Sequence, residues 1–176
     1  QPAPVPEWQE EGDPRKDITL DQLLRMSSGL AFEEVYFPPS DATDMLFKSA
    51  DAAAIAAQSP LGGPPDSEWY YSSGTTNLLS RIVRQTVGDS DYLAFPHERL
   101  FGPVGMQSAV IETDASGTYV GSSFMYATAR DWAKFGLLYL KDGVWNGQRL
   151  LPEGWVTYTR TATPKAPGGC YGAQFW

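Results

Sequence analysis

The sequence is poor in the two residue types that most often bind metals or form covalent cross-links. Among its 176 residues there is one cysteine, Cys170, and one histidine, His97. One cysteine excludes an internal disulfide, and the pair leaves too few ligands for a Cys/His zinc site. We therefore expect no metal. We interpret His97 as a solvated residue in a charged helical context and Cys170 as an unreactive loop residue.

Basic residues and long apolar runs are also scarce. Thirteen Lys and Arg against twenty-one Asp and Glu give a formal net charge of -8 and a pI near 4.5. An acidic surface repels phosphate backbones, which argues against nucleic-acid binding. No apolar run approaches the roughly 20 residues of a membrane span, so we expect none. The compartment stays open between periplasm and cytoplasm, because an export signal would lie before Gln1.

Several catalytic and nucleotide-binding motifs are missing. The sequence has no Gly-x-Ser-x-Gly nucleophile elbow, no Gly-x-x-x-x-Gly-Lys phosphate loop and no Gly-x-Gly-x-x-Gly. We expect no organic cofactor. Two glutamate pairs, Glu10-Glu11 and Glu33-Glu34, are adjacent in sequence, and adjacent side chains do not converge as a catalytic carboxylate pair must. We interpret both pairs as solvated charge.

What the sequence does contain is a series of short amphipathic helices in a globular composition, 42% hydrophobic and 19% charged. The proline-rich, acidic residues 1–17 suggest an extended connection, residues 18–162 a mainly helical region, and residues 163–176 a loop leading into a sheet strand. Caps and apolar spacing predict a helix over 20–27 and helical structure in one or two pieces over 41–58. They also predict a helix that ends before Gly88, a kinked one around Pro96, one from Thr128, and one from Pro152. Asn146-Gly147 predicts a hairpin with strands at 144–145 and 149–151.

The phrase Tyr70-Tyr71-Ser72-Ser73-Gly74 stands out because it opens a predicted helix. A phenol at a helix N-terminus meets the positive end of the helix dipole, which lowers its pKa. With a second cation nearby, Tyr71 would be a usable general base near neutral pH. Alternatively, the aromatic residues pack the helix onto the core and the serines cap it. These residues alone leave both interpretations open.

Five blocks, at residues 18–30, 69–84, 101–106, 128–136 and 145–152, are similar in order and pattern to a family signature. They resemble T-x-x-x-L-L-x-x-x-S-G-L, F-x-Y-S-x-x-x-x-x-L-L-x-x-I-V, F-x-P-L-G-M, T-A-R-D-x-A-R-F-G and W-N-G-x-R-I-L-P of the serine β-lactamase-related family. That family spans class C β-lactamases, DD-peptidases, esterases and 6-aminohexanoate-oligomer hydrolases. The resemblance implies an α/β, β-lactamase/DD-peptidase-like fold, this segment being mainly its helical subdomain with a short β-hairpin.

The resemblance also implies an acyl-enzyme mechanism, in which the serine of a Ser-x-x-Lys motif attacks a carbonyl group. Tyr71 matches the family tyrosine that acts as general base or acid. Ser73 stands where class C enzymes have asparagine and would contact the substrate, while Trp69 and Tyr70 would shape the pocket wall. Serine at this position weakens a β-lactamase assignment and favours a small amide or ester substrate.

The sequence contains no Ser-x-x-Lys. In the family that motif lies before the position matching Gln1, and the Lys/His-x-Gly strand lies after the position matching Trp176. We therefore expect residues 1–176 to be the central part of one catalytic domain, inactive without the remaining segments of that domain. The alternatives are a non-catalytic homologue that binds peptide or peptidoglycan, and a helical interaction domain with Tyr71 in its core. The oligomeric state is not indicated.

Overall fold

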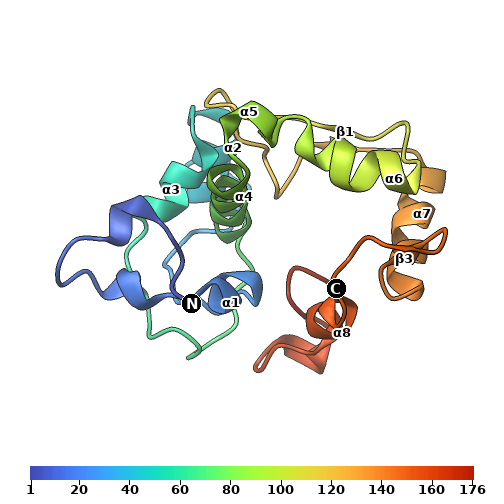
Figure 1. Ribbon diagram of the computed structural model, residues 1–176. Coiled ribbons are helices and arrows are strands. Elements are labelled where there is room, and N and C mark those ends of the chain that lie inside the picture. Colours follow the sequence, from blue (N-terminus) through green and yellow to red (C-terminus); the bar gives the residue numbers. More distant parts are fainter.

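The computed structural model describes every residue from Gln1 to Trp176, and the fold is mainly helical (Figure 1). The α-helices are α1 (Leu20–Leu24), α2 (Asp41–Phe47), α3 (Ala52–Gln58), α4 (Ser73–Val87), α5 (Asp89–Tyr92), α6 (Gly102–Val104), α7 (Ala129–Leu140) and α8 (Trp155–Arg160). Shorter turns of helix are η1 (Pro6–Trp8), η2 (Pro14–Asp17), η3 (His97–Phe101) and η4 (Pro167–Gly169). None of these helices combines the length and apolar character needed to cross a bilayer.

The strands form two separate antiparallel hairpins rather than one large sheet. Strand β1 (Val110–Ile111) pairs with β2 (Met125–Tyr126), and β3 (Val144–Trp145) pairs with β4 (Gln148–Arg149). The second hairpin turns at Asn146 and Gly147, which both have positive φ angles, as a type I′ turn requires. The hairpin is therefore confirmed, although its second strand begins one residue earlier than expected.

Buried hydrophobic side chains form two main groups, one in each half of the chain. The larger group, which we call the N-terminal core, holds fifteen buried residues between Ala3 and Ile82. The smaller group, the C-terminal core, consists of Phe101, Val104, Met106, Ala109 and Leu138. In Figure 1 the blue-to-green half and the yellow-to-red half lie on opposite sides of the molecule.

Helix α4 approaches α3 closely because small residues line their contact. The buried face of α3 consists of Ala52, Ala53, Ala56 and Ala57. In the first turn of α4, a Cβ placed on Gly74 would lie 2.6 Å from the Phe32 ring and 2.8 Å from the Ala56 Cβ. No side chain fits there in a close-packed interior. This contact fixes the start of α4 against the N-terminal core.

Residues 1–17, which we expected to form an extended connection, pack into the N-terminal core. Trp8 is fully buried, and its Nε1 donates to the carbonyl oxygen of Ala57 at 2.9 Å. Arg15 donates to the same oxygen at 3.0 Å and pairs with Asp13 at 2.6 Å. These bonds satisfy a carbonyl at the C-terminal end of α3. Proline content indicated irregular backbone correctly, but it did not reveal that the few apolar residues are buried.

The capping signals place most helix starts correctly. Thr19 forms a capping box with Gln22 at the start of α1, and the Thr128 side chain accepts from the Asp131 backbone N–H at the start of α7. Gly88, with a φ of 88°, follows the last residue of α4. Local side chain-to-backbone bonds therefore set these boundaries, as their sequence signals indicate.

Other boundaries differ from expectation. Helix α1 ends at Leu24 rather than near residue 27, and Met26 just beyond it has a φ of 59°. Helix α8 begins at Trp155 and not at Pro152, because Gly154 takes a left-handed conformation between them. Residues 163–176 contain η4 and no strand, where we expected the start of a sheet strand. A sheet edge needs a neighbouring strand to pair with, and these residues have none.

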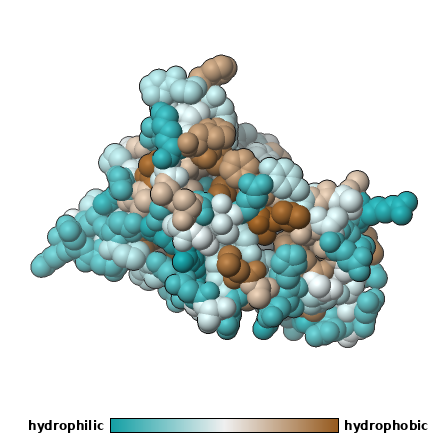
Figure 2. All heavy atoms as spheres, turned by 90° about the horizontal axis from the view of Figure 1, so that it is seen from above, coloured by the Kyte–Doolittle hydropathy of each residue, from teal (hydrophilic) through white to brown (hydrophobic).

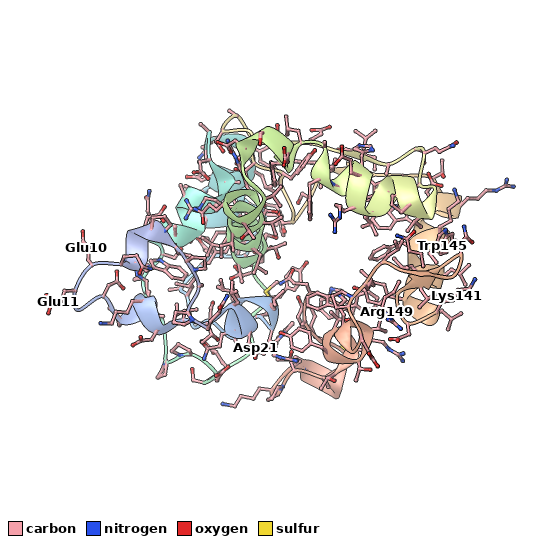
Figure 3. The ribbon with its side chains drawn as sticks, in the orientation of Figure 1. Glu10, Glu11, Asp21, Lys141, Trp145 and Arg149 are labelled. Carbon is pink, nitrogen blue, oxygen red and sulfur yellow. The ribbon has the colours of Figure 1, made fainter.

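The C-terminal segment returns to the N-terminal half of the chain. Tyr158 of α8 donates to Asp21 Oδ1 of α1 at 2.6 Å, and the Gln174 backbone N–H donates to the Leu24 carbonyl at 2.9 Å. Figure 3 shows Asp21 on α1 where it faces α8. The last residues of the chain therefore lie beside the start of the fold.

Part of the apolar surface is uncovered. Phe37 and Leu140 are each 82% exposed. A cavity of about 350 Å³, lined mainly by hydrophobic side chains, lies between α4 and residues 92–100. Seen from above in Figure 2, brown hydrophobic residues gather in the middle of the face, with teal hydrophilic residues along its margins.

Candidate functional site

Tyr71 lies immediately before the first turn of α4. Ser72 is the N-cap, and its side chain accepts from the Thr75 backbone N–H at 3.2 Å. The Tyr71 side chain is 36% exposed, so it is neither sealed in the core nor fully solvated. Gly74 allows the first turn of α4 to pack closely on the core. This packing holds the neighbouring Tyr71 phenol at a defined place on the surface. This position is compatible with contact to a ligand.

The pKa of Tyr71 shifts in the direction opposite to our expectation. Partial burial raises it, and the negative charge of Glu34 raises it further. The helix dipole was expected to lower it, but removing a phenolate from water opposes ionisation more strongly here. Within these residues Tyr71 is therefore a protonated phenol at neutral pH, able to donate a hydrogen bond. Action as a base would need a cation.

Tyr71 belongs to a group of four aromatic rings, which we call the aromatic group: Trp69, Tyr71, Tyr171 and Trp176. The Tyr71 ring centroid lies 5.6 Å from that of Trp176 and 6.2 Å from that of Tyr171. Trp69 packs edge-on against Tyr171 at 5.4 Å, and Trp176 is 68% exposed. These tilted and edge-on arrangements are the favoured ones for aromatic pairs. The Tyr71 ring is therefore packed within a cluster of aromatic side chains.

Ser73, the first residue of α4, is buried and bonded to a carboxylate. Glu34 accepts from the Ser73 backbone N–H at 2.7 Å and from the Ser73 hydroxyl at 2.6 Å. Tyr36 also donates to Glu34, at 2.6 Å, and its oxygen lies 3.2 Å from Ser73 Oγ. We call these three residues the Glu34 cluster. A carboxylate at a helix N-terminus is stabilised by unpaired backbone N–H groups and by the helix dipole.

The interpretation of Glu34 as solvated charge is therefore wrong. The prediction stands for Glu10 and Glu11, which point away from the molecule in Figure 3. Glu34 differs because the backbone carries it across the first turn of α4, where N–H and hydroxyl donors compensate its desolvation. Adjacent glutamates need not share an environment.

Tyr70 lies against the same segment of chain. Its hydroxyl oxygen accepts from the Glu34 backbone N–H at 3.1 Å. Tyr70 also lines a cavity of about 350 Å³ together with Phe32, Glu33 and Asp41 among others. Trp69, Tyr71 and Ser73 do not line this cavity. Trp69, Tyr70, Tyr71 and Ser73 therefore lie in one neighbourhood, but of these four only Tyr70 faces this cavity.

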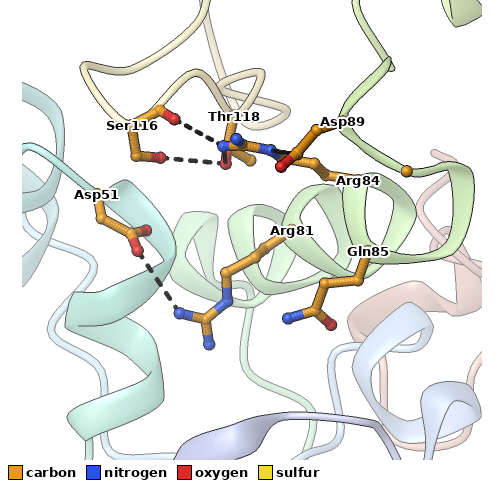
Figure 4. A pocket seen from close by; sticks show the side chains of 8 residues that line it. Asp51, Arg81, Arg84, Gln85, Asp89, Ser116 and Thr118 are labelled. Atoms are coloured by element: carbon orange, nitrogen blue, oxygen red, sulfur yellow. Dashed lines mark hydrogen bonds and ion pairs between the residues drawn. The ribbon is translucent and has the colours of Figure 1, made fainter. Parts of the chain in front are cut away.

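A second, polar cavity lies along α4 away from Tyr71 (Figure 4). It measures about 380 Å³, and its lining includes Arg81 and Arg84. Arg81 pairs with Glu7 at 2.8 Å, and Arg84 pairs with Asp89 at 2.7 Å. The two guanidinium charges are compensated by carboxylates, which leaves little attraction for an anion. No group of three or more His, Cys, Asp or Glu residues is arranged to hold a metal ion.

Comparison with known proteins assigns the family. Residues 2–175 match the model of the Beta-lactamase family. The chain belongs to the Beta-lactamase family, and its fold is β-lactamase-like, as the five sequence blocks indicated.

Individual relatives share the fold over about half their length. The chain is 26% identical over 177 aligned positions to the 6-aminohexanoate-dimer hydrolase of Paenarthrobacter ureafaciens, covering 88% of this chain and 45% of that protein. A structure from Bacillus anthracis, itself provisionally assigned as a 6-aminohexanoate-dimer hydrolase, is 25% identical with a TM-score of 0.74, covering 93% and 48%. A D-stereospecific amidohydrolase from Streptomyces sp. is 18% identical with a TM-score of 0.70, covering 96% and 59%.

Sequence reasoning missed four residues of this neighbourhood. Glu34 and Tyr36 reach it from a loop whose distance from α4 no local pattern encodes. Tyr171 and Trp176 reach it from the end of the chain, where the density of aromatic residues was the available signal.

Proposed function

We propose that the intact protein is a serine hydrolase that cleaves a small amide or ester through an acyl-enzyme, with Tyr71 as general base or acid. The Ser-x-x-Lys pair that this chemistry needs lies outside the present chain. Membership of the Beta-lactamase family and the similarity to proteins named as hydrolases support the proposal. The observation that carries it is the partly exposed Tyr71 phenol at the start of α4.

The environment of Tyr71 suggests when each role applies. As a protonated phenol it can donate to a leaving group, which is the acid role. A lysine ammonium brought close by the rest of the domain would lower the pKa again and permit the base role. The proton would pass from the nucleophilic serine through Tyr71 to the leaving group.

The binding contacts follow from the same neighbourhood. Ser73 would contact the substrate, while Trp69 and Tyr70 would form its wall. The similarity to a 6-aminohexanoate-dimer hydrolase, together with serine rather than asparagine at position 73, favours a small linear amide over a β-lactam. The other segments of the same catalytic domain are the required partners, and they would cover the apolar cavity beside α4.

The test is Tyr71→Phe in the intact protein, because it removes the hydroxyl and keeps the ring. We expect kcat/KM for a p-nitrophenyl ester to fall by about 10²–10⁴-fold, with an unchanged Tm. The matched control is Tyr126→Phe, since Tyr126 is 54% exposed on the distant strand β2. A fall in Tm with activity retained would overturn the proposal and favour a packing role for Tyr71.

Two further outcomes concern the alternatives. A fluorophosphonate probe should label the intact protein and should not label residues 1–176 alone, because the isolated segment has no Ser-x-x-Lys. If the intact protein is not labelled but binds a peptidoglycan-derived peptide, the non-catalytic homologue is the better description.

A further inference from the structure

Gln174 has a backbone conformation that residues other than glycine rarely adopt. Its φ is 56°, in the left-handed region. A Cβ crowds the following carbonyl oxygen in this region, which is why glycine usually occupies such positions. A strained residue persists only where its surroundings hold it, and such residues concentrate at functional sites. The contacts of Gln174 show what holds it.

Gln174 connects the C-terminal segment to two elements of the N-terminal half. Its side-chain Oε1 accepts from the Thr76 hydroxyl, on α4, at 2.9 Å. Its backbone N–H donates to the carbonyl of Leu24, the last residue of α1, at 2.9 Å, and its Nε2 donates to the same oxygen at 3.4 Å. Gln174 is partly buried and belongs to the lining of the apolar cavity beside α4. Hydrogen bonds in apolar surroundings are stronger than exposed ones.

These two elements hold the backbone on either side of Tyr71. Just beyond the end of α1, the Met26 carbonyl accepts from the Tyr70 backbone N–H at 2.9 Å. Thr76 lies on the other side of Tyr71, within α4. Gln174 is therefore bonded both to the turn of chain that fixes the residue before Tyr71 and to the helix that begins after it.

The C-terminal segment has independent contacts that keep Gln174 in place. A Cβ on Gly172 would overlap the Thr159 carbonyl oxygen, so only glycine fits between this segment and α8. The Ala173 backbone N–H donates to the same Thr159 oxygen at 3.0 Å, and the Thr163 hydroxyl donates to the Gly172 carbonyl at 2.9 Å. Because these contacts fix the residues just before Gln174, its amide group can hold α4 from a fixed position.

The segment that Gln174 anchors also carries two rings of the aromatic group. The Tyr171 ring lies edge-on to the Tyr71 ring, with centroids 6.2 Å apart, and the Trp176 centroid lies 5.6 Å from that of Tyr71. A shift of this segment away from α4 would move both rings relative to the Tyr71 phenol. Gln174 is thus linked to Tyr71 through hydrogen bonds and through ring packing.

We propose that Gln174 is a positioning residue for Tyr71, because its bonds to Thr76 and Leu24 hold the start of α4 and the C-terminal segment in one arrangement that places the phenol for proton transfer. The inference rests on the proposed hydrolase function and adds a residue that acts only through Tyr71. Proton transfer requires the two atoms to be within hydrogen-bond distance. A displaced phenol therefore slows the chemical step more than it weakens substrate binding.

The decisive variant is Gln174→Gly, which removes the amide and also relieves the left-handed backbone. The lost bonds and the relieved strain act on stability in opposite directions. With the intact protein and the p-nitrophenyl ester, we expect kcat to fall about tenfold or more, with KM within about twofold and the Tm little changed.

Asp142→Gly is the matched control. Asp142 has a φ of 50°, is exposed, and follows α7 in the C-terminal half of the chain. The change relieves the same kind of backbone strain without touching the contacts of α4. It should leave kcat within about twofold of the wild type.

A Tyr71→Phe background shows whether Gln174 acts through the phenol. If it does, the double variant with Gln174→Gly should be as slow as Tyr71→Phe alone, within about twofold, because there is no hydroxyl left to position. A merely structural contact would not depend on that hydroxyl. Losses that multiply would show that Gln174 acts elsewhere and would overturn the inference.

A second variant keeps the test decisive if Gln174→Gly lowers the Tm. Thr76→Val removes the hydroxyl that bonds to Gln174 and keeps the β-branched shape. It should reproduce the fall in kcat, and combining it with Gln174→Gly should add little. An unchanged kcat in both single variants, or a lower Tm with kcat retained, overturns the inference while wild-type turnover still supports the hydrolase. No turnover by the wild type overturns the proposed function instead.

Discussion

The two halves of the chain are stabilised in different ways. The N-terminal core packs fifteen buried hydrophobic residues between Ala3 and Ile82, whereas the C-terminal core has five. The smaller core is supplemented by a polar network, in which Asp131 of α7 accepts from Ser108 Oγ at 2.6 Å and from Lys134 at 2.7 Å. Lys134 also donates to the carbonyl of Gly105. The N-terminal half has ion pairs of its own, such as Arg15 with Asp13, so the two halves differ mainly in the size of their hydrophobic cores.

This difference places the candidate site on the better-packed half. Tyr71 and Ser73 sit at the start of α4, which is the element that Gly74 seats against α3 and Phe32. Sites on rigid elements hold their groups more accurately than sites on loops. The C-terminal half contributes only Tyr171 and Trp176 to this neighbourhood, through its last residues.

The largest expected effect comes from truncating one large buried side chain in each core and comparing the loss of stability. Trp8→Ala should destabilise the intact protein by about 3–5 kcal/mol, because it leaves a cavity and orphans the Ala57 carbonyl. Leu138→Ala should cost toward the lower end of about 2–5 kcal/mol, because the smaller core can collapse more easily. Urea unfolding measures both.

Catalytic activity gives a second measurement for the Trp8→Ala and Leu138→Ala variants. Trp8→Ala should also reduce turnover, because the N-terminal core supports α4, whereas folded Leu138→Ala protein should retain it. Equal loss of activity in the two variants would show that the halves do not support the site differently.

A smaller effect is expected when one helical glycine in each half is replaced by alanine. Gly74→Ala should destabilise the protein by about 1–3 kcal/mol, because the new methyl group overlaps the Phe32 ring. Gly136→Ala in α7 should instead stabilise it by up to about 1 kcal/mol, because nothing lies within 4 Å of that Cβ. Thermal unfolding of the two variants should give shifts of opposite sign. Shifts of the same sign would contradict the packing described for α4.

The smallest effect concerns pH. Hydrogen bonds from Lys134 and then Ser108 lower the pKa of Asp131 from 3.8 to about 2. A carboxyl whose pKa is lower in the folded state adds stability above its unfolded pKa and loses that contribution as the pH falls through the folded value. The contribution is therefore complete above about pH 4 and lost toward pH 2.

Asp131→Asn should lower the Tm at neutral pH and flatten the dependence of Tm on pH between 4 and 2. The matched variant in the other half is Asp13→Asn, because Arg15 likewise lowers the pKa of Asp13 to about 2. Unchanged acid sensitivity in both variants would mean that these bonds do not act as described.

Local signals predicted the helices well, and tertiary contacts explain where they failed. The caps at Thr19 and Thr128 depend on bonds within a few residues, so the sequence encodes them directly. The burial of Trp8 depends on Ala57, which is 49 residues away. No periodicity within residues 1–17 could reveal that contact.

The site shows the same division. The start of α4 and the position of Tyr71 were predictable, since Ser72 and the apolar spacing of the helix mark them. Glu34 was not, because its partner Ser73 lies 39 residues further along the chain. Nor was the direction of the Tyr71 pKa shift, which depends on burial and on Glu34 rather than on the helix end. Helix identity is local information, and electrostatic environment is not.

The return of the last residues to α1 has a consequence for the order of folding. Gln174 bonds to the Leu24 carbonyl across 150 residues of sequence, so closing this contact costs much chain entropy. The early helices can assemble through short-range contacts, whereas the aromatic group joins residues 69 and 71 to residues 171 and 176. Tyr71 therefore gains two of its three ring contacts only when that long-range contact forms, so the surroundings of the phenol would be completed after the N-terminal core.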